Sequence, residues 1–506
     1  MRNAVTPLLT LVAPPEMAAA LEAVLHREPR LSELVQVVSE ASAAPVGSVL
    51  TVDAAGISSA VEWSESLPPL VLPQPLPYTE ENLLALVFLY LGNWEKAYEY
   101  AASNAVLHHD FDRLNRLQAG VAVEVPAAPI NDVGSFEHYR RWHNRAVVLH
   151  YGQLTQFADA ADLQAAYQRA IAHAPAADWQ AFSAKHYATF LLDNGQLDEA
   201  RQLLADALNL PLDAAAHHEL LAVETGVLLQ QLTVPYDTDL LAELKDKLWQ
   251  TLTYYEQQQR PLQAALTLLD AAQVANFSDS FAEALGYLNR ATTLLSHEDA
   301  PELLANAQYR KGVLLFTWAQ NGNPQFYRGA MTAYQQALQV FTRNEAYPVF
   351  AEIQHHLGII YSEIPDEVKK KSIWAAVSVS SFNQALEYFT RETHPYEYAT
   401  ISNHYGNALT KFPLAARSDN FAKALGFYRE ALAVRTARAY PYERALTLLN
   451  FLEAAWQVNL ENDPDPEVLL AEMTAYAEEI PQLVEDAALV EEAQQHLLRL
   501  ETVVLA

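Results

Sequence analysis

The chain has 506 residues, of which 51% are hydrophobic, and its 32 basic and 62 acidic side chains give a net charge of −30. So acidic a chain has few cations to neutralise phosphates, which disfavours sequence-independent nucleic-acid binding and contact with anionic membrane surfaces. The absence of cysteine excludes disulfides, thiolate metal sites and cysteine nucleophiles within this chain. Abundant alanine and leucine, with only 15 glycines, predict a helical protein with an ordered core.

Residues 1–77 do not follow the pattern of the rest of the chain. The periodicity predicts a short strand within Val5–Val12, helices over Pro15–His26 and Leu31–Ser42, and short strands at Val49–Val52 and Val61–Trp63. The first apolar run is interrupted by a proline, so a structured segment is favoured over a signal peptide.

The stretch from Leu67 to Pro77 holds too many prolines for a helix. Its leucine and valine residues predict an extended arm that packs along the helices that follow. The alternative is a disordered linker.

Residues 78–277 predict helix hairpins of uneven length. Thr79 begins the first, with acidic residues in its first turn, where the helix dipole favours them. Compact hairpins turn at Gly92 and Gly195. Longer helices are expected over Asp213–Gln231, Asp237–Gln258 and Pro261–Asn276.

Residues 278–460 contain four long copies of one predicted helical hairpin. Each copy carries a small residue, an aromatic residue or leucine four positions later, and alanine three positions after that. The small residues are Ala284, Ala330, Ser378 and Ala424, so successive copies lie 46, 48 and 46 residues apart. A glycine keeps the same offsets at Gly312, Gly358 and Gly406, with Leu452 in the fourth copy, and prolines lie between the two marks at Pro301, Pro348, Pro395 and Pro441. Three separate marks near one period indicate a repeat architecture.

Each mark has a physical role in a pair of packed helices. Proline in the first turn of a helix loses no hydrogen bond, and small residues let two helix backbones approach while aromatic rings fill the space beside them. Because one hairpin cannot bury its apolar face alone, neighbours must stack. The sequence therefore predicts an all-α protein, an α-solenoid of stacked antiparallel helix hairpins with a small non-repeat N-terminal segment. Residues 461–506 predict acidic capping helices, with an acidic recognition tail as the alternative.

The repeat resembles the tetratricopeptide repeat (TPR) family. Leu357, Gly358 and Tyr361 fit the L-G-x2-Y core of that family, and Pro348 fits its closing proline. The family repeat is about 34 residues and these copies are about a dozen longer. In this length, and in Phe-Thr-Arg at 341–343 and 389–391, they resemble bacterial TPR arrays that accompany CHAT-type proteases. With no cysteine in this chain, such a protease would be another polypeptide.

The resemblance implies that the first helix of each hairpin lines a concave groove. Its implied partner-binding residues are Asn306, Tyr309, Phe316, Glu352, His355, Asn403, Asn407, Lys411, Glu453 and Trp456. Asn403 and Asn407 lie one helical turn apart, so their amides can hydrogen-bond an extended peptide, or can be solvated or bridge two repeats. Phe316 and Trp456 are candidate aromatic anchors, with ordinary core packing as the alternative.

No motif in the sequence predicts a catalytic, cofactor or metal site. The leading hypothesis is a cytoplasmic, non-catalytic scaffold or adaptor that binds a protein or peptide. The acidic field would attract a basic partner, and the alternative reason for the acidity is the solubility of a large helical surface. A second hypothesis is a regulatory or sensor subunit of a separate protease or nuclease in a bacterial signalling or defence complex. A third is a hydrolase within residues 1–77.

Overall fold

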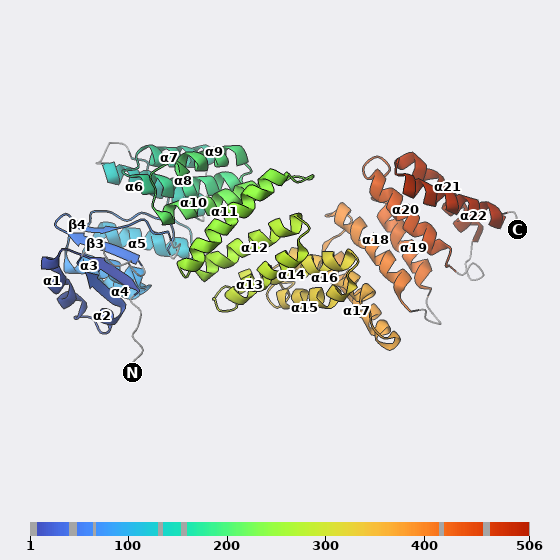
Figure 1. The fold of residues 1–506 in the computed structure, drawn as a ribbon, viewed down its shortest axis with the longest axis horizontal. Coiled ribbons are helices and arrows are strands. Elements are labelled where there is room, and N and C mark those ends of the chain that lie inside the picture. Colours follow the sequence, from blue (N-terminus) through green and yellow to red (C-terminus); the bar gives the residue numbers. More distant parts are fainter. Residues whose placement is uncertain are drawn as a thin grey trace. The chain divides into compact units, whose positions relative to one another are not determined.

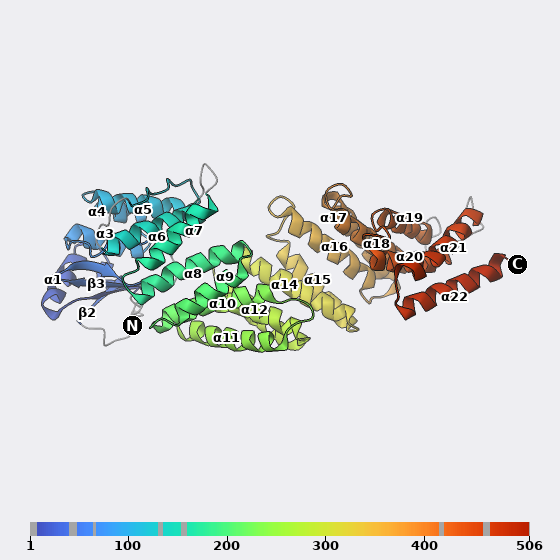
Figure 2. The same ribbon diagram turned by 90° about the horizontal axis from the view of Figure 1, so that it is seen from above.

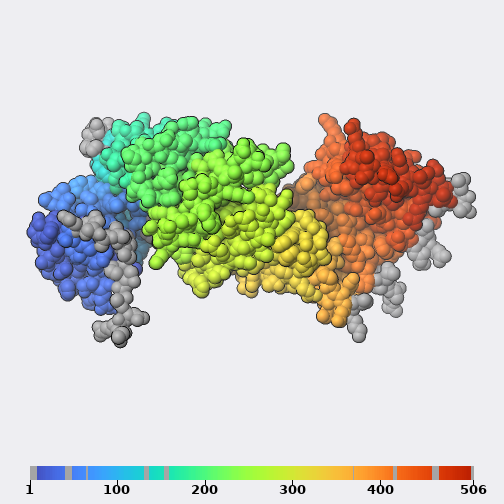
Figure 3. All heavy atoms as spheres, viewed as in Figure 1, coloured from blue at the N-terminus to red at the C-terminus, as the bar shows by residue number. Residues whose placement is uncertain are grey.

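The structure is a computed structural model that describes residues 8–39, 48–63, 67–129, 135–152, 159–413, 419–458 and 466–504. The chain divides into two compact units, Met1–Tyr254 (unit 1) and Tyr255–Ala506 (unit 2). Figures 1 and 2 show antiparallel helix hairpins stacked within each unit, and side chains fill the spaces between the ribbons (Figure 3). This confirms the predicted fold class, an α-solenoid with a small strand-containing segment at its start.

Unit 1 begins with a four-stranded sheet in the order β2-β1-β3-β4, in which β1 pairs in parallel with β2 and β3, and β3 pairs antiparallel with β4. The elements are β1 (Leu9–Val12), α1 (Pro15–Leu25), α2 (Leu31–Leu34), β2 (Val35–Val38), β3 (Ser48–Asp53) and β4 (Gly56–Ser59). The helix predicted over Leu31–Ser42 is wrong from Val35 to Val38, and residues 40–42 of that prediction lie outside the described residues. The stretch Val35-Gln-Val-Val is rich in β-branched residues, and it extends to pair with β1. The last strand ends at Ser59, before the predicted Val61–Trp63.

The proline-rich arm, residues 67–77, lies against a helix of unit 1. Asn144 on α6 (Ser135–Tyr151) accepts from the backbone N–H of Val71 and donates to its carbonyl, both at 2.8 Å. The neighbouring His143 lies 2.8 Å from the carbonyl oxygen of Pro69. Two adjacent side chains of one helix therefore replace the sheet partner that an extended backbone otherwise needs.

The remaining helices of unit 1 are hairpins of uneven length. They are α3 (Glu80–Tyr90), α4 (Trp94–Ala101), α5 (Ala105–Gln118), α6, α7 (Ala160–Ala172), α8 (Ala177–Asp193), α9 (Leu197–Leu208), α10 (Ala214–Gln231) and α11 (Thr238–Gln257), which crosses the division. Helix α3 begins where Thr79 caps it through the N–H of Asn82. Seven consecutive residues, Leu83 to Leu89, are buried in α3, so this helix lies inside the core that it shares with the sheet.

Unit 2 contains the four long repeats and the C-terminal helices. Its elements are α12 (Pro261–Phe277), α13 (Phe281–Leu295), α14 (Pro301–Gln320), η1 (Pro324–Phe326), α15 (Tyr327–Ala337), α16 (Tyr347–Glu363), α17 (Val368–Tyr388), α18 (Pro395–Lys411), α19 (Asn420–Leu432), α20 (Pro441–Ala455), α21 (Pro466–Leu483) and α22 (Ala487–Val504). The expected boundary at residue 277 falls inside this unit, because α12 packs on α13.

The repeated glycines allow the two helices of a hairpin to pack around an aromatic ring. A Cβ added at Gly312 would lie 2.6 Å from Tyr334, at Gly358 2.9 Å from Phe382, and at Gly406 2.5 Å from Tyr428. All three rings are buried. Glycine is therefore required at these points by the close approach of a ring, as the spacing predicted.

The chain enters each first helix through the same backbone conformation. The N-cap residues Ala300, Ala346, His394 and Tyr440 have φ between −146° and −140° and ψ between 59° and 64°. In the last three copies a threonine four residues earlier accepts the N–H of the N-cap residue through its carbonyl, at 2.9–3.0 Å. Helix α16 begins at Tyr347, one residue before Pro348. The first residues of the four first helices are therefore spaced by 46, 48 and 46 residues, as the small residues and glycines are, whereas the prolines depart from that spacing at Pro348.

None of the helices in the described ranges is long and apolar enough to cross a membrane.

Candidate functional site

Polar side chains connect the first helices of successive long repeats in unit 2. We call these contacts the inter-repeat ladder. They are Tyr309 Oη donating to Glu352 Oε1 (2.7 Å), His355 Nε2 with His404 Nδ1 (2.9 Å), and Asn450 Nδ2 donating to Asn403 Oδ1 (3.1 Å). The ladder joins α14 to α16, α16 to α18, and α18 to α20.

Burial keeps both histidines of the ladder neutral. It lowers the pKa of His404 to about 4 and that of His355 well below its usual value. Two neutral imidazoles can share one N–H···N hydrogen bond, whereas two imidazolium ions would repel each other. Burial and the bond to Glu352 raise the pKa of Tyr309, so its hydroxyl stays a donor.

The ladder uses several of the residues that the resemblance places in a groove. Each of four predicted groove residues contacts a residue of a neighbouring repeat, namely Tyr309, Glu352, His355 and Asn403. Asn403 is only 7% exposed. The repeat-bridging alternative thus describes the observed contacts of Asn403.

Three further predicted residues have partners within unit 2. Asn306 Oδ1 accepts from Arg310 Nε at 3.0 Å. Phe316 is buried and stacks on His356, with ring centroids 5.0 Å apart, which matches the core alternative. Lys411 forms an ion pair with Glu363 on α16.

A hollow of about 620 Å³ lies on α18, α19, α20 and α22. We call it the C-terminal hollow, and its lining residues are Asn407, Thr410, Lys411, Phe421, Tyr428, Asn450, Glu453, Ala454, Trp456, Gln457, His496 and Arg499. It brings together four of the predicted groove residues, namely Asn407, Lys411, Glu453 and Trp456.

An aromatic and a cation form one wall of this hollow. The guanidinium of Arg499 lies 3.9 Å from the ring centroid of Trp456, a cation–π contact. Trp456 Nε1 donates to His496 Nδ1 at 2.8 Å, which fixes the plane of the indole. Arg499 is exposed and forms no ion pair with the residues that the structure describes, so its guanidinium remains accessible to a ligand.

Two carboxylates lie close together beside that wall. Burial, the charge of Glu453 and the hydrogen bond that protonated Glu492 donates to Glu453 raise the pKa of Glu492 on α22. Glu453 is exposed and Glu492 is half-buried. Two carboxylates so close repel each other when both are ionised, and a cation placed between them removes that repulsion.

Asn407 contributes an amide to the same hollow. Its Oδ1 accepts from Tyr428 Oη at 2.8 Å, so the Nδ2 group is left to donate to a ligand. Thr410 Oγ1 donates to the carbonyl of Asn407 at 2.8 Å and is not paired with His496. The lining residues therefore offer hydrogen bonds and charge without an activated nucleophile.

Sequence reasoning missed the contribution of α22. The prediction of acidic capping helices over residues 461–506 assigns no binding residue to this helix, which carries Glu492, His496 and Arg499. The available signal was Arg499, the one basic residue among the acids of residues 461–506. A lone cation in such a segment is better explained by a specific contact, here with Trp456.

No protein-family model matches the chain, and no curated protein matches it. A similar solved structure is a signal transduction ATPase with numerous domains with a tetratricopeptide repeat sensor from Pyrococcus horikoshii, at 15% identity and a TM-score of 0.47, covering 84% of this chain and 56% of that one. Yeast Tom70 matches at 10% identity and a TM-score of 0.31, covering 84% and 82%. IFIT1, solved with m7Gppp-AAAA, matches at 14% identity and a TM-score of 0.37, covering 85% and 92%. At these scores the description of the fold rests on the packing of the chain itself.

Proposed function

We propose that this chain is a non-catalytic scaffold or adaptor that binds a basic protein or peptide segment in the C-terminal hollow. The observation that carries the proposal is a hollow of about 620 Å³ that is lined by Glu453 and by the Arg499–Trp456 wall, with Glu492 adjacent to Glu453. Ligand pockets commonly measure about 300–1,000 Å³, so this volume accommodates one or two side chains of a peptide.

Because Lys411 is already paired with Glu363, the carboxylate of Glu453 and that of the adjacent Glu492 favour a lysine or arginine of the partner on their side of the hollow. Such a cation would sit between Glu453 and Glu492, and it would gain from both carboxylates while relieving their repulsion. The net charge of −30 would also draw a basic segment towards the chain. The amide of Asn407 can then donate to a backbone carbonyl of the same segment.

The proposal can be tested by selecting from a random peptide library displayed on phage with the full chain as bait. We expect peptides that share a lysine or arginine next to an aliphatic or aromatic residue. The double variant Glu453→Gln, Glu492→Gln should bind the selected peptides at least about 10-fold more weakly, because a charge-assisted hydrogen bond contributes ~1.5–3 kcal/mol.

The matched control removes two carboxylates elsewhere in the same unit. Glu302 and Glu397 lie exposed in the first turns of α14 and α18, outside the hollow. The double variant Glu302→Gln, Glu397→Gln has the same net charge as the test variant and should bind as the natural chain does. Equal binding by both double variants, or selection of no common sequence, would overturn the proposal.

A further inference from the structure

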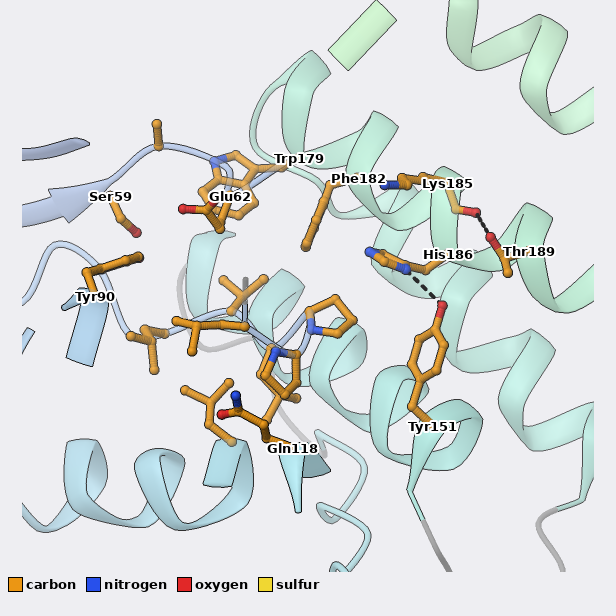
Figure 4. Close-up of a pocket in the computed structure, with 18 residues that line it drawn as sticks. Ser59, Glu62, Tyr90, Gln118, Tyr151, Trp179, Phe182, Lys185, His186 and Thr189 are labelled. Atoms are coloured by element: carbon orange, nitrogen blue, oxygen red, sulfur yellow. Dashed lines mark hydrogen bonds between the residues drawn. The ribbon is translucent and has the colours of Figure 1, made fainter. Parts of the chain in front are cut away.

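We propose that unit 1 contains a second and separate binding site, which takes a neutral small molecule with an aromatic or branched aliphatic body and one hydroxyl group. The site is a pocket of about 490 Å³ between the proline-rich arm and helix α8, and the imidazole of His186 binds the hydroxyl (Figure 4).

The walls of the pocket are mainly apolar. The arm contributes Pro68, Pro69, Leu70 and Val71, and α8 contributes Trp179 and Phe182. The arm is held in place by the bonds from His143 and Asn144, so this wall is part of the folded core. An aromatic or branched aliphatic group that enters would exchange water for these side chains, at about 25 cal/mol per Å² of apolar surface buried.

His186 supplies an unused hydrogen-bonding atom in this apolar setting. Its Nδ1 lies 2.9 Å from Tyr151 Oη, while its Nε2 is buried and has no hydrogen-bond partner among the described residues. The side chain is only 5% exposed, so most of this imidazole is removed from bulk solvent. Figure 4 shows the nitrogen that does not contact Tyr151 on the side of the ring that faces the pocket.

The nearest ring gives this nitrogen little compensation. Phe182 packs edge-to-face with His186, with ring centroids 4.8 Å apart and planes at 87°. A ring face is at best a weak acceptor, and it offers nothing to a nitrogen lone pair. A buried polar atom without a partner costs ~1–3 kcal/mol, which a bound hydroxyl would recover.

A hydroxyl fits His186 whichever of its nitrogens carries the proton. If Tyr151 donates to Nδ1, then Nε2 carries the proton and donates to the ligand oxygen. If Nδ1 carries the proton, Nε2 accepts from the ligand hydroxyl. A hydroxyl can act in both ways, whereas an ether or a carbonyl can only accept.

The charges around the pocket favour a neutral ligand. Burial and the positive charge of Lys185 keep the pKa of His186 well below its usual value, so the ring is uncharged at neutral pH. The ammonium of Lys185 pairs with Glu219 at 2.6 Å, and Glu62 accepts a hydrogen bond from Ser48 at 2.9 Å. An anionic or cationic ligand would therefore lose its hydration without an unengaged counter-charge.

The test compares three probes of one skeleton by isothermal titration and ligand-observed NMR with the full chain. Thymol carries the hydroxyl, p-cymene lacks it, and cuminate carries a carboxylate in place of the ring methyl group of p-cymene. We expect thymol to bind about 5-fold more tightly than p-cymene, from a net hydrogen bond of ~1 kcal/mol, and cuminate to bind least.

Variants assign the binding to the pocket. His186→Phe keeps a ring in place and should lower thymol affinity to that of p-cymene, without weakening p-cymene. His173→Phe replaces an exposed histidine outside the pocket and should change neither. Thr189→Trp fills the pocket and should block both probes.

Three results would overturn the proposal. They are the absence of binding by thymol at millimolar concentration, equal binding of thymol and p-cymene that His186→Phe leaves unchanged, and binding that survives Thr189→Trp. Circular dichroism of each variant confirms that unit 1 remains folded. No variant in this test alters the C-terminal hollow, so failure of the small-molecule proposal leaves the peptide-binding proposal intact. Failure of the peptide-binding proposal likewise leaves the pocket beside His186 untouched.

Discussion

The two units differ in whether an apolar contact between their helices recurs along the chain. In unit 1 neighbouring helices are joined by buried polar contacts that each occur once, such as Arg140 with Asp110 at 2.7 Å and Lys185 with Glu219 at 2.6 Å. In unit 2 one apolar contact, a glycine against an aromatic ring, recurs in three successive repeats. A contact that recurs leaves a period in the sequence, whereas a contact that occurs once leaves none.

The largest expected effect comes from breaking a buried charge pair of unit 1. The side chains of Lys185 and Glu219 are 6% and 3% exposed. Lys185→Met leaves the carboxylate of Glu219 buried without the ammonium that neutralises it, which should lower the free energy of unfolding of unit 1 by about 3–5 kcal/mol. Urea denaturation followed by circular dichroism measures the change.

The double variant Lys185→Met, Glu219→Leu is the control for this prediction. It removes both charges and leaves apolar groups of similar volume, so it should recover most of the lost stability. If the double variant is as unstable as Lys185→Met alone, the loss of stability comes from altered packing. The buried charge pair would then contribute less to the stability of unit 1 than its burial indicates.

The corresponding test in unit 2 compares two glycines of one repeat. Gly406→Ala places a Cβ 2.5 Å from the ring of Tyr428, so the ring or a helix must move, at a cost near the upper end of ~1–3 kcal/mol. Gly426→Ala, in the partner helix, meets nothing within 4 Å and should stabilise the helix by about 0.5–1 kcal/mol. Thermal and urea unfolding of both variants should give shifts of opposite sign, and shifts of the same sign would contradict the role assigned to the repeated glycines.

Mild acid should lower the free energy of unfolding by a smaller amount, because the buried histidine His143 of unit 1 resists protonation in the folded state. Burial lowers the pKa of His143 to about 4, from an ordinary value of 6.5. Because the folded pKa is the lower one, the unfolded chain takes up the proton first, and stability is lost as the pH falls from about 6.5 towards 4. His143 alone should account for about 2 kcal/mol between pH 8 and pH 5.

The pH dependence of unfolding for His143→Gln measures this contribution. The variant should lose about 2 kcal/mol less than the natural chain over the same interval, whatever its stability at pH 8. His297→Gln, which replaces an exposed histidine of unit 2, is the matched substitution at a surface site. Parallel curves for the natural chain and His143→Gln would show that this histidine titrates normally.

The same contrast explains how much of the molecule could be predicted from the sequence. The spacing of Gly312, Gly358 and Gly406 predicted the long hairpins, because each glycine meets an equivalent ring. The local sequence could not predict that Val35–Val38 forms a strand, because this strand depends on pairing with β1, more than twenty residues earlier.

The candidate sites were predictable only in part, for a related reason. Four residues of the C-terminal hollow follow from their positions in the repeat, but Glu492, His496 and Arg499 lie on α22, outside it. Asn403 and His355 have the positions expected for groove residues, and it is the facing side chains of the next repeat that occupy them. The pocket beside His186 depends on an arm more than a hundred residues away in sequence, whose path no local pattern indicates.

The shared N-cap conformation before α14, α16, α18 and α20 has a consequence for how this array can change length. Because the backbone passes each of these joints with nearly the same φ and ψ, a segment cut out between two joints leaves ends that already fit each other. Gene duplication or deletion of one whole repeat would thus need no new turn, only a new match between the side chains of the ladder. The joints make the array extensible, and the ladder determines which copies can become neighbours.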